Sequence, residues 1–185
     1  EKVQSQWLFG FLKAPFPLRP WLDIRMPTFG LSDQHTTQLI KYFNGLSRVE
    51  SPFAYFDEKN VPPDHLDAAR KLVSEEYFNC FSCHVRGGKN PEGPPEGWAP
   101  DLAMARQRLN PNWIIKWIQD PQKIQPGTKM PSFYPGGPDD ILGGKDDRQI
   151  EALRDYVMSL GRTGGATAAS ASPATQDNRA KAVNR

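Results

Sequence analysis

Residues 80–84 read Cys-Phe-Ser-Cys-His, and this short pattern constrains the chain more than any other feature of its sequence. Cys80 and Cys83 are the only cysteines among 185 residues. Two thiols three positions apart on one helical turn can each add to a vinyl group of a porphyrin, and His84 then presents its imidazole to the iron. The pattern therefore predicts covalently attached haem.

A Cys-x-x-Cys pair has two other common uses. A redox-active thiol pair does not involve His84, and no βαβ pattern surrounds the motif. A structural zinc site takes four ligands, and the remaining histidines, His35 and His65, lie at no suitable spacing. Chance would produce the full pattern in about one chain in a thousand of this size. Haem attachment is the favoured interpretation.

Composition narrows the classes of partner. The 23 Lys and Arg residues against 21 Asp and Glu residues give a net charge of +2, and basic residues do not cluster, so nucleic acid is not expected as a partner. No apolar run approaches the roughly 18 residues of a membrane span, so no transmembrane segment is expected in this chain. The 18 prolines and 15 glycines indicate long loops around short helices.

The chain divides into four expected parts. Residues 1–46 are apolar and aromatic, and residues 47–63 have the proline content of a linker. Residues 64–161 contain the cysteine motif and helical patterns. Residues 162–185 hold almost no large apolar side chain and cannot bury enough surface to fold alone, so they are expected to form a low-complexity tail.

The first and third parts contain an internal repeat. Residues 7–29 and residues 113–133 share tryptophan at the first position, prolines at matching places and a Met-Pro pair close to a phenylalanine. Met26 and Met130 occupy the same place in the two copies. The repeat predicts that residues 1–46 are the C-terminal half of a second, upstream domain of the same kind.

An amphipathic helix is expected after each Met-Pro pair, over residues 32–43 and about residues 146–160, with Ser32 at the N-cap of the first. The first copy has no Cys-x-x-Cys-His half. Either a haem motif precedes Glu1, or this copy has lost its haem and survives as packing. The former is favoured because the chain starts inside a helix-like segment.

An iron bound by His84 needs a second axial ligand or leaves an open site. Methionine sulfur is a soft ligand that raises the reduction potential. Met130 is predicted because its proline-rich loop can hold the sulfur against the haem, and the same reasoning makes Met26 a ligand of a second haem. Met104 is too close to the motif in sequence, and Met158 is expected in the core of a helix pair.

Several segments together form a known pattern: Cys80–His84, Ala99-Pro100-Asp101-Leu102, Arg108-Leu109 with Trp113, Pro121, and Pro126-Gly127-Thr128 with Met130-Pro131. On these segments the chain resembles the class I c-type cytochromes over about residues 64–161, and in part over residues 1–46. The resemblance implies an all-α fold, with a few helices wrapped around covalent haem and the terminal helices crossing. The loops at residues 86–98 and 134–144 are long and rich in proline and glycine, and such loops are frequent docking places.

The resemblance also implies three further cofactor-binding residues. The Pro100 carbonyl accepts a hydrogen bond from the ring of His84, which fixes the tautomer of the imidazole. Arg108 lies near a haem propionate, although a solvated helix position is the alternative. Trp113 packs near the haem edge, which is compatible with an ordinary core position.

Electron transfer is the expected function, since an iron with both axial positions filled has no place for substrate. The linker, half-domain and tail favour a mono- or dihaem subunit of a membrane-associated respiratory or photosynthetic complex. Its expected place is the periplasm or the outer face of the cytoplasmic membrane, in contact with redox partner proteins or other subunits. The alternatives are a haem subunit of a dehydrogenase or peroxidase, or a docking subunit. A peroxidase needs an acid–base group over an open iron, and no motif places His35 or His65 there. Whether the chain itself is an enzyme stays open.

Overall fold

The computed structural model describes residues 1–48 and 56–161. Within these residues the backbone forms isolated β-bridges but no β-strand, which confirms the predicted all-α fold. None of the described helices is long and apolar enough to cross a bilayer. Residues 49–55 of the predicted linker and the predicted tail at 162–185 lie outside the described residues. The α-helices are α1 (Ser5–Lys13), α2 (Asp33–Leu46), α3 (Pro63–Leu72), α4 (Ala105–Arg108), α5 (Pro111–Gln119), α6 (Pro121–Ile124) and α7 (Asp146–Leu160).

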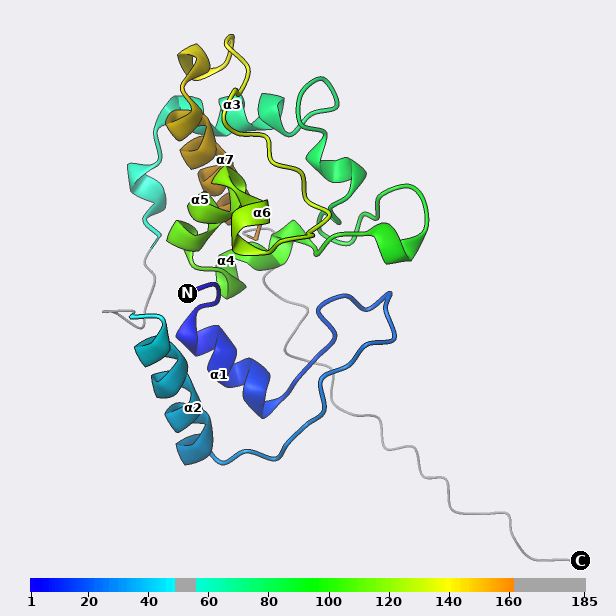
Figure 1. Cartoon of the computed structure of the whole chain (residues 1–185), viewed down its shortest axis with the longest axis vertical. Helices are drawn as coiled ribbons and strands as arrows, with labels where there is room; N and C mark the ends of the chain where they lie inside the picture. The colour runs from blue at the N-terminus through cyan, green and yellow to red at the C-terminus, as the bar shows by residue number, and fades with distance from the viewer. Residues whose placement is uncertain (49–55, 162–185) are drawn as a thin grey trace, which may run out of the picture.

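Helix α7 is the centre of the fold. It packs on α3, α4 and α5, and α3 lies across it in Figure 1. Helices α1 and α2 pack on each other at the other end of the molecule, and α1 also contacts α4. Met158 on α7 is 1% exposed, so its predicted place in the core is confirmed. Other buried members of this core are Ala69, Leu72, Trp113, Ile114, Ile150, Leu153 and Tyr156.

Side-chain caps begin several of these helices. The Ser32 hydroxyl accepts a hydrogen bond from the backbone N–H of His35 at 3.1 Å, as predicted for the start of α2. Asn110 caps α5 in the same way, with Pro111 at the first helical position. The predicted end of α2 at residue 43 is too early. The helix continues to Leu46 because Asn44 in its last turn hydrogen-bonds to Ser5 of α1 at 3.1 Å.

The two copies of the sequence repeat fold alike. Helices α1 and α5 are both nine residues long, and each carries a stacked pair of rings at matching positions. Trp7 and Phe11 have ring centroids 4.8 Å apart, and Trp113 and Trp117 have theirs 5.1 Å apart. Helix α2 packs on α1 as α7 packs on α5. The repeat therefore extends from sequence to tertiary structure.

The prediction that the chain starts inside a helix is wrong. Residues 1–4 are extended, and α1 begins at Ser5. Val3 forms an antiparallel bridge with Leu109, and the backbone N–H of Gln4 donates to the Arg108 carbonyl at 2.8 Å. Extended backbone is favoured here because its polar groups find partners in the linker between α4 and α5.

The proline- and glycine-rich segment at 134–144 is held against α7. Gln149, which is fully buried, donates through its side-chain amide to the carbonyls of Pro138 and Ile141, both at 2.8 Å. The Asp146 carboxylate accepts the backbone N–H groups of the loop glycines. A Cβ at Gly137 would lie 2.0 Å from Gln149 Oε1, so glycine is required there. Partner docking through this loop stays a prediction.

A buried hydrogen-bonded pair joins α3 to α7. Nδ1 of His65 lies 2.7 Å from Oδ2 of Asp155, and both side chains are almost fully buried. Arg154 contacts the other carboxylate oxygen. A second pair, Arg148 with Asp64, links the same two helices at 2.8 Å but is about half exposed. The two contacts between these helices thus differ clearly in burial.

Replacing Asp155 with Ala is expected to lower the free energy of unfolding by about 3 kcal/mol, because it strands a buried imidazole and guanidinium. Replacing Asp64 with Ala is the matched control and should cost less than about 1 kcal/mol, because its partner stays solvated. Chemical denaturation of the haem-loaded protein measures both. Equal losses for the two variants would show that burial of the His65 pair is not what stabilises the contact.

Candidate haem site

The cysteine motif forms a short 3-10 turn over Cys80–Ser82. The turn follows Asn79, whose backbone is left-handed with φ 46°, and the N–H of His84 donates to the Cys80 carbonyl at 3.0 Å. Both thiols are free, Cys80 partly buried and Cys83 exposed. Burial raises the pKa of the Cys80 thiol to about 11, so the site favours uncharged sulfur at neutral pH.

A hydrogen bond at Nδ1 fixes the orientation of the His84 imidazole. Its Nδ1 lies 2.9 Å from the Pro100 carbonyl oxygen, which is the contact that the resemblance implies. The backbone N–H of Ala99 donates to the Cys83 carbonyl at 2.7 Å and holds the two segments side by side. Burial lowers the pKa of His84, opposed by the Pro100 bond and by Asp101. The ring is therefore neutral at pH 7, and Nε2 carries the lone pair that an iron would bind.

Asp101 fixes the turn that follows the motif. Its carboxylate accepts the backbone N–H groups of Gly87 at 2.9 Å, Gly88 at 3.1 Å and Ala103 at 2.8 Å. Both glycines have positive φ, a conformation that suits residues without a Cβ. Sequence analysis quoted Asp101 only as part of the resemblance and missed this role. The signal was an acid directly before a helical turn, the usual capping position.

The sulfur of Met130 lies against α5. Trp117 donates its indole N–H to Met130 Sδ at 2.8 Å, and the Gln122 amide donates to the Met130 carbonyl at 3.0 Å. Trp117 stacks on Trp113, which is 8% exposed and belongs to the core. Trp117 and Gln122 were not predicted as site residues. The signal for Trp117 was the repeat itself. In both copies an aromatic residue, Phe11 or Trp117, follows the first tryptophan by one helical turn.

Arg108 stands at the end of α4, facing α1. Its guanidinium carbon lies 5.4 Å from the ring centroid of Trp7, and its Nε is buried with no hydrogen-bond partner. Burial, together with repulsion from Arg19, lowers the pKa of Arg108. The propionate contact that the resemblance implies for Arg108 stays a prediction.

Met26 is not brought together with these residues. It lies in the loop between α1 and α2, drawn in blue at the side of Figure 1, and is 37% exposed. Its neighbours Ile24 and Phe29 are 79% and 61% exposed. This loop therefore presents an apolar surface. The role of Met26 as an iron ligand stays a prediction.

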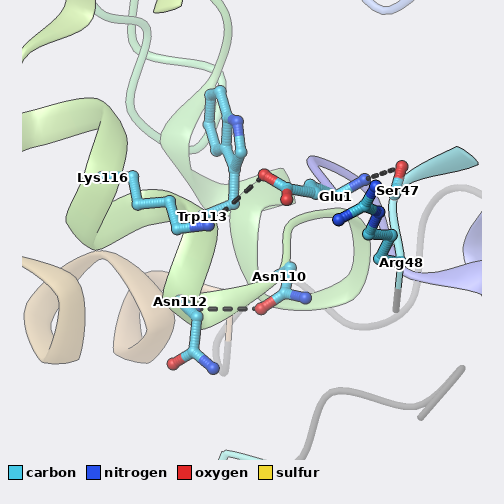
Figure 2. A pocket seen from close by; sticks show the side chains of 7 residues that line it. All are labelled: Glu1, Ser47, Arg48, Asn110, Asn112, Trp113 and Lys116. Atoms are coloured by element: carbon cyan, nitrogen blue, oxygen red, sulfur yellow. Dashed lines mark hydrogen bonds and ion pairs between the residues drawn. The ribbon is translucent and has the colours of Figure 1, made fainter. Parts of the chain in front are cut away.

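Figure 2 shows a hollow at the junction of the two copies, away from the cysteine motif. In it the amino terminus donates to the Ser47 hydroxyl at 3.1 Å, and Lys116 lies 3.4 Å from the Glu1 carboxylate. The other lining residues are Arg48, Asn110, Asn112 and Trp113. Because Trp113 is the only aromatic residue of its otherwise polar lining, and neither cysteine lines it, this hollow does not suit a porphyrin.

The residues around the motif fit covalent haem. The chain offers two free thiols on one turn and the neutral imidazole of His84, whose Nδ1 is already hydrogen-bonded. It also offers the thioether of Met130 and the buried Nε–H of Arg108, which has no partner among the described residues. Thiols suit the vinyl groups, nitrogen and sulfur suit the iron, and a guanidinium suits a carboxylate. Bound haem would supply a one-electron iron couple.

Comparisons with known proteins agree with this fit. The sequence model of the family described as Cytochrome c matches residues 67–161, slightly more than half of the chain. The chain is 30% identical over 130 residues to cytochrome c oxidase subunit 2 of Bacillus sp. (strain PS3), covering 57% of this chain and 34% of the relative. It is 35% identical over 85 residues to the fructose dehydrogenase cytochrome subunit of Gluconobacter japonicus, covering 43% of this chain and 16% of the relative.

A second relative of the first kind, cytochrome c oxidase subunit 2 of Bacillus subtilis (strain 168), is 30% identical over 97 residues, covering 46% of this chain and 25% of the relative. The chain thus spans about a third or less of the length of these relatives. No solved structure gives a significant match. The fold, the motif and the family match together show that the chain belongs to the cytochrome c family and is an electron-transfer cytochrome with covalently bound haem c.

Proposed function

We propose that the chain passes single electrons through one haem joined to Cys80 and Cys83, with His84 and Met130 as axial ligands. The observation that carries this proposal is the 2.9 Å contact between His84 Nδ1 and the Pro100 carbonyl. Since Nδ1 donates its proton to that carbonyl, Nε2 is the one ring nitrogen with a lone pair for iron. With both axial positions filled, the haem exchanges electrons and binds no substrate.

Met130 is the better-supported second ligand among the methionines. Its sulfur lies on the Trp117 indole in a loop that α5 and Gln122 hold in place. Met158 is buried in α7 and 1% exposed, so its sulfur cannot turn outward without unpacking the core. Met104 lies in a short turn beside α4. A thioether on a loop can adopt the position that a metal requires at lower cost than one on a packed helix.

Replacing Met130 with Ala in the haem-loaded protein is expected to lower the reduction potential by on the order of 0.1 V, within the roughly 0.8 V range that axial ligands span. The sulfur-to-iron absorption of the oxidised protein should disappear as well. Spectra recorded during a redox titration measure both effects. Met104→Ala is the matched control and should change neither. An unchanged potential in Met130→Ala would show that another group is the ligand.

We further propose that the protein works as a subunit of a membrane-associated respiratory complex, on the extracytoplasmic side, where covalent haem is attached. Likeness to oxidase subunits and to a dehydrogenase cytochrome subunit supports a role beside larger redox partners. The dehydrogenase-type subunit is the second candidate, and its catalytic site would then lie on another chain. A peroxidase is disfavoured, because His65 is buried against Asp155 and His35 is exposed on α2.

Residues 1–46 are proposed to be the C-terminal half of a second cytochrome domain, with residues 64–161 as the complete one. The matched helices and ring pairs of α1 and α5 support this proposal. Met26 would then serve a second haem, and its exposed loop would lie over that group. One feature differs between the copies, since Phe11 stands where Trp117 donates to Met130, and a phenyl ring has no N–H to hold a sulfur.

A haem count on the full natural protein tests the second haem. The alkaline pyridine spectrum, divided by protein concentration and read with the intact mass, is expected to give two haems for each chain. The Met26→Ala variant should then shift the potential of one haem and leave the other unchanged. A count of one would assign residues 1–46 to packing or docking and would remove Met26 from the list of ligands.

A further inference from the structure

The two copies of the repeat meet about an approximate two-fold axis. Val3 and Leu109 occupy the same place in their copies, and they form an antiparallel bridge with each other. On either side of this bridge the Gln4 N–H donates to the Arg108 carbonyl at 2.8 Å, and the Asn110 N–H donates to the Lys2 carbonyl at 2.9 Å. Each bond is the counterpart of the other, as in an isologous interface.

The same symmetry exchanges cations between the copies. Lys2 and Arg108 are counterparts, and each reaches across the junction to the tryptophan that opens the other copy's helix. Nζ of Lys2 lies 4.7 Å from the ring centroid of Trp113, while the guanidinium of Arg108 lies 5.4 Å from that of Trp7. These are cation–π distances. Each cation of this pair therefore lies over a ring of the other copy, while Lys2 itself remains exposed.

Positive charge accumulates at the junction. Burial lowers the pKa of Lys2 and of Arg108, and repulsion between the two lowers that of Lys2 further. Arg19, an exposed residue in the loop after α1, also repels both groups. Among residues 1–48 and 56–161, no carboxylate forms an ion pair with any of these three. Like charges held together cost free energy unless an anion joins them.

Two buried hydrogen-bond donors also have no partner among residues 1–48 and 56–161. They are Nε of Arg108 at the junction and the indole N–H of Trp21, whose ring packs against Trp98. Buried N–H groups almost always find an acceptor, so an unpaired one marks a place where a group not present in the chain belongs. Three cations and two free donors make a site for an anion with several acceptor oxygens.

Contacts lead from this cluster to both candidate iron ligands. Lys2 lies 5.7 Å from the Trp117 ring, and Trp117 donates to Met130 Sδ. On the other side the Trp21 ring packs edge-on against Trp98, with centroids 5.7 Å apart. Trp98 directly precedes Ala99 and Pro100, the segment that holds the motif and its imidazole. Aromatic rings therefore connect the cluster to the segments that carry both proposed axial ligands.

We propose that Lys2, Arg19 and Trp21 of the first copy complete, with Arg108, the binding site for the two carboxylates of the haem at Cys80 and Cys83, and thereby raise its reduction potential. This inference rests on the proposed function, because the anion is part of the haem. It assigns a cofactor role to residues outside the segment that matches the family model. Positive charge near the haem favours the reduced iron, which carries one more electron.

The test compares single variants of the full haem-loaded protein by redox titration. Lys2→Gln and Arg19→Gln should each lower the equilibrium constant for reduction roughly tenfold, a shift of about 59 mV for a one-electron couple. Lys41→Gln is the matched control, since it removes the same charge from another exposed lysine, on α2, for which no contact with the junction tryptophans is found among the described residues, and it should shift the potential far less. Arg19→Lys keeps the charge and should retain the wild-type potential.

A smaller fall is expected for Trp21→Phe, which keeps a ring but removes the N–H. If Lys2→Gln and Arg19→Gln behave like Lys41→Gln while the pyridine spectrum still shows covalent haem, the carboxylate site is overturned and the proposed function stands. If the wild-type protein carries no covalent haem, the proposed function fails first. Added phosphate should leave the wild-type potential nearly unchanged. If phosphate shifts the wild-type potential by as much as the Arg19→Gln substitution does, the cluster binds a solution anion and the proposal is overturned.

Discussion

The contact between the His84 imidazole and the Pro100 carbonyl is the constraint on which the site depends. It does not act alone, because backbone bonds from Ala99 to Cys83 and from Leu102 to Val85 run beside it. Two segments that are separated by a long loop are thereby joined as a pair. The imidazole is oriented by backbone atoms, whose positions vary less than those of side chains, so the ligand is prepared before the iron arrives.

Around this pair the chain has few long elements. Helices α4 and α6 have four residues each, and isolated helices of such length are not stable in water. They persist because α4 packs on α7, which has fifteen residues, and α6 packs on α5, which itself packs on α7. Gln149 and Asp146 on α7 hold the proline- and glycine-rich loop at 134–144 through its backbone. The order of that loop thus comes from one helix.

The first copy of the repeat joins this structure closely at its extended start. Gln4 is bonded through its backbone to Arg108 and through its side chain to the carbonyls of Arg106 and Leu109. The two copies therefore share one boundary, and a charge in one copy acts on groups of the other. The first copy also carries exposed apolar side chains, in the loop around Met26 and on α2, where Tyr42 and Leu46 are 61% and 65% exposed.

The sequence by itself determined the class of the fold, the covalent cofactor, the existence of the repeat and the limits of α7, because these follow from spacing and period along the chain. It also located the capping serine of α2. The extended start at residues 1–4 could not be predicted, since its backbone partners lie more than a hundred positions away and leave no local pattern. The Trp117 bond to Met130 and the pairing of His65 with Asp155 span 13 and 90 positions, and neither contact leaves a local pattern in the sequence. Only tertiary structure decided which cations meet at the junction, because charge density at a point depends on how the chain folds back on itself, and not on net charge.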